Sequence, residues 1–141
     1  MTTMRAKLLF VAVAFVTAPL AALAHHSFAA EFDANKPLVL KGTITRVDLV
    51  NPHAWLYINV PGPDGKAVNW AIEMGAPNAL IRRGITKAAV PIGAEITVEG
   101  FAAKDGSNTA NGRTLRMADG RALFAGSSNT GAPAEAARPA P

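Results

Sequence analysis

The three histidines of this chain are the residues whose types and positions point most directly to chemistry. His25 and His26 follow a candidate signal peptide, and His53 lies in a short segment between two expected strands. Cleavage after Ala24 would give His25 a free amine, which can chelate one metal ion together with its ring Nδ1. His53 is then the expected third nitrogen ligand. Such nitrogens suit Cu(II), and both kinds of group can lose a proton near neutral pH, so copper is the candidate cofactor.

His26 is not expected to join the same chelate, because its ring points away from that of its neighbour. It can serve a second ion or hold a bound anion. The alternative interpretation is structural: His25 and His26 are a polar start of the mature chain, and His53 is a hydrogen-bonded turn residue. No cysteine or carboxylate cluster adds ligands, and Met74 and Met117 stand at strand positions where methionine usually fills the core.

Residues 1–24 have the three parts of a secretory signal. Arg5 and Lys7 precede an apolar run at 8–16, and Ala22-Leu23-Ala24 is a small-residue cleavage site. The alternative is an uncleaved membrane anchor, but the apolar run is short for a membrane span. We therefore expect a periplasmic or secreted protein with no stable membrane insertion after cleavage.

Composition excludes several classes of function. Removal of the signal takes away two of the 14 basic residues and none of the 10 acidic ones, so the weakly basic mature chain gives no reason to expect a nucleic-acid partner. The absence of cysteine excludes disulfides, thiolate metal sites, a cysteine nucleophile and a lipoprotein anchor. No Ser-His-Asp arrangement is legible, so we expect no catalytic residues and a non-enzymatic protein.

Alternation of apolar and polar residues predicts a mainly β domain over residues 38–125. Strands are expected at 38–49, 54–60, 66–74 and 94–101, followed by a hairpin of 113–118 and 121–125. Asp119-Gly120 is a two-residue turn signal within that hairpin. A change of phase in the first strand predicts a bulge near Thr45-Arg46, and Gly42 is expected in an inward position.

One short helix is predicted at 77–83, between the third and fourth strands. Pro77 suits its first position, Gly84 follows its end, and Arg82-Arg83 are expected to be helix-end charges rather than a binding patch. The oxygen-rich segment 104–112 lacks the spacing of a calcium loop. It is therefore expected to be a loop.

Three strands, a short helix and two or three further strands fit a small five- to six-stranded Greek-key barrel of the OB type. A small open β-sandwich is the alternative. An N-terminal arm is expected at 25–37, ended by Pro37 and attached to the barrel by Phe28 and Phe32. The tail at 126–141, rich in Ser, Asn, Pro and Ala, is expected to be disordered.

Trp55 and Tyr57 form a second candidate site, because alternation puts both on the same face of one strand. In an OB-type barrel an outward aromatic pair can stack on bases or sugar rings. The alternative is that both pack under the N-terminal arm, against Phe28 and Phe32, or under a loop.

Several motifs resemble a family of small exported bacterial proteins of uncharacterised function. They are HHSFAAEFD directly after the signal, then KGTIT, NPHAWLY, PNALIRRG, ITVEGF, AKDGSNTANGR and ADGRALFAGSS. The resemblance covers residues 25–128 and implies an exported single domain, with no activity attached. Separately, His25 and more weakly His53 resemble the histidine brace of lytic polysaccharide monooxygenases and of some small periplasmic copper carriers, as an analogy of site rather than of ancestry.

Two hypotheses of different classes follow. The first is a periplasmic copper carrier or buffer with ligands from His25 and His53. The second is a metal-free binding module whose Trp55 and Tyr57 face holds a small ligand, glycan or protein partner. Oxidative copper chemistry is a weaker third possibility.

Overall fold

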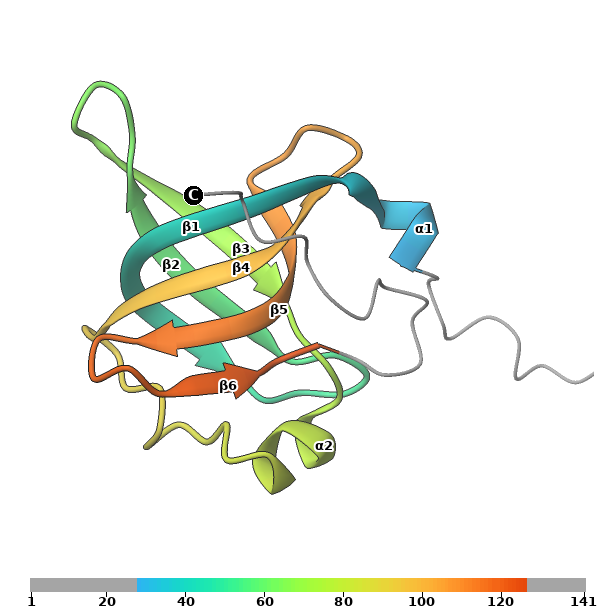
Figure 1. Cartoon of the computed structure of the whole chain (residues 1–141), viewed down its shortest axis with the longest axis vertical. Coiled ribbons are helices and arrows are strands. Elements are labelled where there is room, and N and C mark those ends of the chain that lie inside the picture. Colours follow the sequence, from blue (N-terminus) through green and yellow to red (C-terminus); the bar gives the residue numbers. More distant parts are fainter. Residues whose placement is uncertain (1–27, 127–141) are drawn as a thin grey trace, which may run out of the picture.

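Six strands and two short helices make up the part of the chain that the computed structural model describes, residues 28–126. In chain order they are α1 (Phe28–Glu31), β1 (Phe32–Asp48), β2 (Trp55–Pro61), β3 (Ala67–Glu73), α2 (Pro77–Arg82), β4 (Glu95–Ala103), β5 (Thr109–Met117) and β6 (Ala122–Phe124) (Figure 1). The predictions of a signal peptide, of a disordered tail and of roles for His25 and His26 fall outside these residues.

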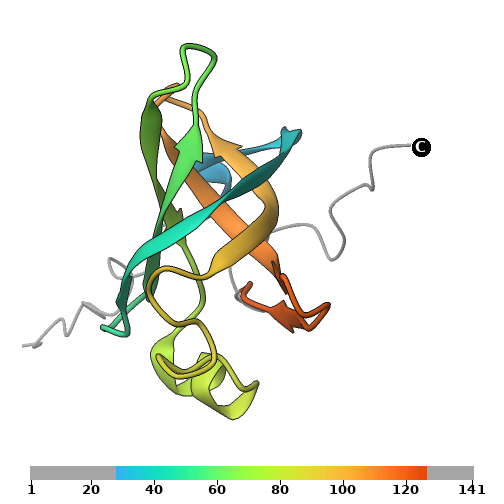
Figure 2. The same cartoon turned by 90° about the vertical axis from the view of Figure 1, so that its left-hand side faces the viewer.

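The strands close into a barrel. Their order is β3-β2-β1-β4-β5-β6, and an additional pairing of β3 with β5 joins the first five into a ring. The β3–β5 pairing is parallel, and the other pairings are antiparallel. Helix α2 lies beyond one end of this ring (Figure 2). The OB-like barrel predicted from the sequence is therefore confirmed, and the open sandwich is not adopted.

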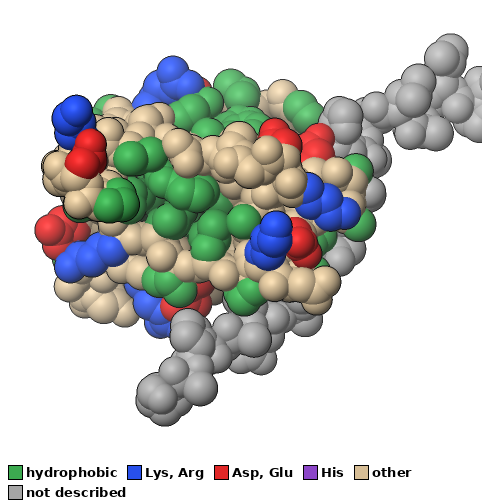
Figure 3. Space-filling view, turned by 90° about the horizontal axis from the view of Figure 1, so that it is seen from above, with side chains coloured by type: hydrophobic (Ala, Val, Ile, Leu, Met, Phe, Trp, Pro, Cys, Tyr) green, Lys and Arg blue, Asp and Glu red, His purple; other side chains and the backbone are tan. Residues whose placement is uncertain are grey.

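Inward side chains from all five strands of the ring fill the barrel. The largest fully buried ones include Ile44, Leu56, Ile72, Val98 and Leu115, and each contributes about 1.5–3 kcal/mol by leaving water. Methionines 74 and 117 belong to the same core, as expected. At the end opposite α2, hydrophobic side chains occupy the middle of the surface and charged side chains lie around them (Figure 3).

Strand β1 begins at Phe32, six residues earlier than predicted, and continues through Pro37. The sequence pattern missed this extension because Pro37 cannot donate a hydrogen bond to a ladder. The pairing with β4 shifts register between Phe32 and Pro37, and such an irregularity tolerates proline. The predicted bulge is confirmed, since the pairing with β2 shifts register between Ile44 and Arg46.

Strand β5 begins at Thr109, inside the segment predicted to be a loop at 104–112. Polar residues enter this strand because it pairs with β3 on one side and β4 on the other, and tertiary pairing overrides their weak strand propensity. The hairpin turn is also longer than predicted. Met117 N–H donates to Arg121 O at 2.9 Å, which leaves three connecting residues, and only Gly120 among them has positive φ.

An aromatic cluster holds the start of the described chain against the outside of the barrel. The Phe28 ring lies 5.7 Å from that of Phe32 and 5.3 Å from that of Phe101, in an edge-on contact with the latter. Lys104 donates from Nζ to Ala29 O at 2.5 Å. The prediction that Phe28 and Phe32 attach the N-terminal arm is confirmed. Within residues 28–126, neither helix is long and apolar enough to cross a membrane.

Gly42 offers a test of the barrel packing. It is buried in β1, and an added Cβ would collide with the backbone oxygen of Asn59. We expect Gly42→Ala to lower the free energy of unfolding by about 1–3 kcal/mol, because the backbone of the neighbouring strand can move away from the added methyl group only by distorting the sheet. Urea unfolding measures the loss. Thr43→Ala, on the exposed face of the same strand, is the control, and equal stability of the two variants would contradict the close approach.

Candidate functional site

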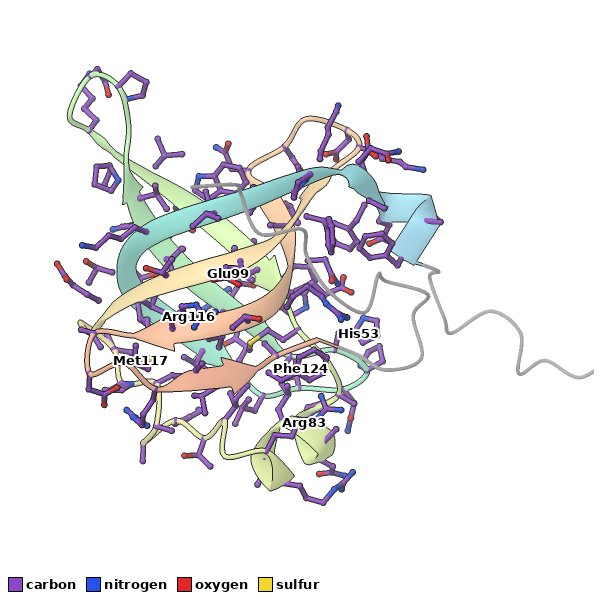
Figure 4. The ribbon with its side chains drawn as sticks, in the orientation of Figure 1. His53, Arg83, Glu99, Arg116, Met117 and Phe124 are labelled. Carbon is purple, nitrogen blue, oxygen red and sulfur yellow. The ribbon has the colours of Figure 1, made fainter. Side chains whose placement is uncertain are left out.

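His53 lies in the turn between β1 and β2, beside the end of β3. Its Nδ1 is 3.1 Å from Oε1 of Glu73, and the two side chains are only 15% and 9% exposed. The turn is held there because Ala54 N–H donates to Gly75 O at 3.1 Å and Met74 N–H donates to Ala54 O at 2.8 Å. The β2–β3 ladder thus continues past both strands and fixes the histidine against the carboxyl group. Figure 4 labels His53 at the right of the view.

Glu73 belongs to a row of side chains on the outside of the barrel. It pairs with Trp55 of β2 and with Asn111 of β5, and Asn111 pairs in turn with Phe101 of β4. The neighbour of Asn111, Gly112, faces inward, since a Cβ there would lie 2.7 Å from Cγ2 of Ile72. Successive residues of a strand alternate faces, so Asn111 points outward, next to Glu73.

Two members of this row are buried although they face outward. Glu73 is 7% exposed and Asn111 is 2% exposed. Among residues 28–126, no group donates a hydrogen bond to Oδ1 of Asn111. A buried amide oxygen without a donor is uncommon in folded proteins.

The electrostatics of Glu73 follow from its surroundings. Burial raises the pKa of Glu73 to about 7, and the negative charge of nearby Glu31 in α1 adds to the rise. Near neutral pH the Glu73 carboxyl group therefore exchanges its proton readily. Ionised, it accepts a hydrogen bond from Nδ1–H of His53; protonated, it donates one to Nδ1.

The second candidate site lies on the outer face of β2. Trp55 and Tyr57 are half-buried there, and the Arg46 guanidinium lies 3.8 Å from the centroid of the Tyr57 ring. A shallow cleft beside Tyr57 is lined by Thr45, Arg46, Tyr57 and Asn69. Phe28 and Phe32 belong to a buried cluster with Phe101 and Ala103.

A third polar group lies where the described chain ends. Arg83 and Arg113 place their guanidinium carbons 4.8 Å and 4.9 Å from the centroid of the Phe124 ring, and Arg83 Nη1 donates to Gly126 O at 2.7 Å. Arg83 and Phe124 are labelled in Figure 4. Arg83 therefore fastens the strand end to the segment after α2, a long-range role beyond the helix-end charge predicted for it.

Sequence reasoning found His53 but not its partners. The sequence pattern assigned no role to Glu73, and the signal available was its outward parity beside the inward Ile72. Asn111 was assigned to a loop, so its pairing with Glu73 could not be predicted from the sequence. In the described part of the chain no three His, Asp or Glu side chains are arranged to hold a metal ion.

The raised pKa of Glu73 predicts how stability depends on pH. The folded chain holds this proton more tightly than the unfolded chain, so the contribution of Glu73 is greatest below its ordinary pKa of 4.5 and is lost as the pH rises to about 7. Between about pH 4.5 and pH 7.5, we expect the free energy of unfolding of wild type to fall by about 1–3 kcal/mol more than that of Glu73→Gln. Urea unfolding in EDTA at the two pH values measures this, with exposed Glu95→Gln as the control. Equal losses in wild type and Glu73→Gln would refute the assignment.

The comparisons with known proteins identify a family but no activity. The profile of a family of unknown function, DUF6152, matches residues 13–112. No curated protein matches the chain. The matched segment includes His53, Glu73 and Asn111, and the resemblance to an uncharacterised family inferred from the motifs is confirmed. The chain therefore belongs to this family of unknown function, DUF6152.

Proposed function

We propose that the protein is exported, cleaved after Ala24, and acts in the periplasm as a non-enzymatic copper carrier or buffer. Its Cu(II) ligands are the amine of His25, the ring Nδ1 of His25 and the ring of His53. The observation that carries this proposal is the 3.1 Å contact between Nδ1 of His53 and the buried carboxyl group of Glu73.

The contact matters because metal-binding histidines usually give their second ring nitrogen to a carboxylate or carbonyl. With Nδ1 engaged by ionised Glu73, the ring holds its proton on Nδ1, and Nε2 is the nitrogen that presents a lone pair to a metal. Glu73 also limits rotation of the ring, since both side chains are largely buried. His53 is thereby oriented as one ligand of a site completed by another segment.

The chain is long enough to bring His25 to this place. Phe28 is anchored on Phe101, and His25 precedes Phe28 by three residues, which span at most about 10 Å. Asn111 lies one strand away from Phe101 and Glu73 lies two strands away, and adjacent strands are about 4.8 Å apart. The first residue of the mature chain therefore falls within reach of the Glu73–His53 pair.

A copper titration of the mature protein tests the proposal. We expect one Cu(II) per chain with nitrogen ligands in the paramagnetic resonance spectrum. His53→Ala and a protein with one extra residue before His25 should each bind at least about tenfold more weakly, since each removes part of the nitrogen set. His26→Ala is the matched control and should bind nearly as wild type. Undiminished affinity in His53→Ala would exclude the three-nitrogen site.

The outer face of β2 supports a second candidate function, a metal-free site for a small ligand or glycan. The observation that favours it is the shallow cleft beside Tyr57, whose lining combines one aromatic ring with hydroxyl, amide and guanidinium groups. The Asn69 amide also contacts Oδ1 of Asn59 at 3.0 Å, so polar groups flank the ring on the β3 side. Such a combination suits a hydroxyl-rich ligand.

Intrinsic fluorescence in EDTA tests this second site. A Trp70→Phe protein leaves Trp55 as the reporter, two residues from Tyr57 on the same face. We expect soluble cell-wall oligosaccharides to shift its emission, and Tyr57→Ala to weaken the binding about fivefold or more, because stacking on one ring is worth about 1–3 kcal/mol. Thr43→Ala, away from the cleft lining, is the control. If millimolar oligosaccharide leaves the Trp55 emission unchanged, the proposed ligand site beside Tyr57 is wrong.

A further inference from the structure

Strand β1 has one unpaired edge along its first part. It pairs with β4 from Phe32 to Thr43, whereas β2 lies against it only from Thr43 to Asp48. Among the strand pairings of residues 28–126, none occupies the other side of β1 before Thr43. In Figure 1 β4 runs below β1, and the unpaired edge is the upper one. Such an edge can accept a further strand.

The main-chain groups at this edge follow from the ladder on the other side. Ile44 N–H donates to Ala94 O at 3.0 Å, so the main chain of residue 44 faces the β4 side. Main-chain groups of successive strand residues point alternately to the two sides. Those of Val39 and Lys41 therefore point toward the unpaired edge. Pro37 falls on the same side, where its missing N–H breaks no bond to β4.

The unpaired edge borders an apolar opening of the barrel. Leu38 and Leu40 of β1, Val60 of β2 and Trp70 of β3 pack on the core but remain partly exposed. They lie at the end away from α2, where Figure 3 shows hydrophobic side chains in the middle of the surface. An extended segment suits this place, because its main chain can pair with the edge while its side chains cover the apolar opening.

We propose that the segment is β1 of a second copy of this chain, antiparallel to the first about a two-fold axis at Val39. Leu38 then lies opposite Leu40 of the second copy, so the apolar faces of the two barrels become continuous. Lys41 lies opposite Pro37 of the second copy, so no like charges meet. The N–H groups of Val39 and Lys41 find carbonyl acceptors on Val39 and Pro37 of the second copy.

The charges beside the edge favour a copy of the chain over a strongly charged partner. Lys36 lies 3.9 Å from Asp33, and Lys41 lies 4.0 Å from Glu95, so both signs are present and balanced there. A partner of one sign gains little from such a surface. Pro37 at one end and β2 at the other limit the length of the unpaired edge. The contact therefore closes as a two-fold dimer and does not continue into a fibre.

Sedimentation of the mature protein in EDTA tests the contact without any metal. We expect a dimer with a dissociation constant on the order of 10 μM, because a small interface binds weakly. Val39→Lys places like charges at the axis and should weaken dimerisation at least about tenfold. Val39 is 49% exposed, so this change leaves the core intact. Val50, 52% exposed and beyond the other end of β1, is the matched position, and Val50→Lys should dimerise as wild type.

Two results of this experiment would overturn the proposal. One is a wild-type protein that stays monomeric at about 1 mM, which would leave the edge to a strand of another protein. The other is a dimer that Val39→Lys and Val50→Lys weaken equally, which would place the interface elsewhere on the molecule.

A disulfide experiment tests the position of the axis. The chain has no cysteine, so Val39→Cys contributes the single thiol of each copy. Residues that face each other in a hydrogen-bonded antiparallel pair have Cα atoms about 5.5 Å apart, which a disulfide can bridge. Under mild oxidation, Val39→Cys should form the linked dimer at least about tenfold faster than Val50→Cys, because pairing brings its thiols together. Equal rates of linking would contradict an axis at Val39.

Discussion

The parallel pairing of β3 with β5 is the interaction on which the rest of this structure depends. It consists of three residue pairs, Ala71–Thr109, Ile72–Ala110 and Glu73–Asn111. Without it both strands would present open edges, and the core would be exposed along one side. The same pairs bring Glu73 beside Asn111, so the contact that closes the barrel also places these two side chains together on its outer surface.

Each closing strand has a structural face and a chemical face. Ile72 and Ala110 point into the core and are fully buried, whereas Glu73 and Asn111 point outward beneath neighbouring segments. The outward pair is nevertheless buried, and the His53 turn, which is tied to the end of β3, contacts Glu73. A site thus forms on the outside of a barrel whose interior is filled with side chains.

The two ends of the described chain are fastened by different forces. At its start, Phe28 is held by aromatic packing on Phe32 and Phe101. At its end, the Phe124 ring contacts the guanidinium groups of Arg83 and Arg113, and burial lowers the pKa of Arg113 from its ordinary value. Aromatic packing therefore fixes the start of the described chain, and cation–ring contacts fix its end.

The sequence by itself determined the barrel, because alternation of apolar residues, the bulge after Ile44 and the helix at Pro77 are local signals. It also singled out His53, since histidine is rare in this chain. Only the tertiary structure decided that residues 109–112 form a strand and that Glu73 lies between His53 and Asn111. Those facts arise from pairing between segments about 40 residues apart, which no local pattern encodes. The burial that changes the acidity of Glu73 has the same origin, because it depends on which segments cover the end of β3.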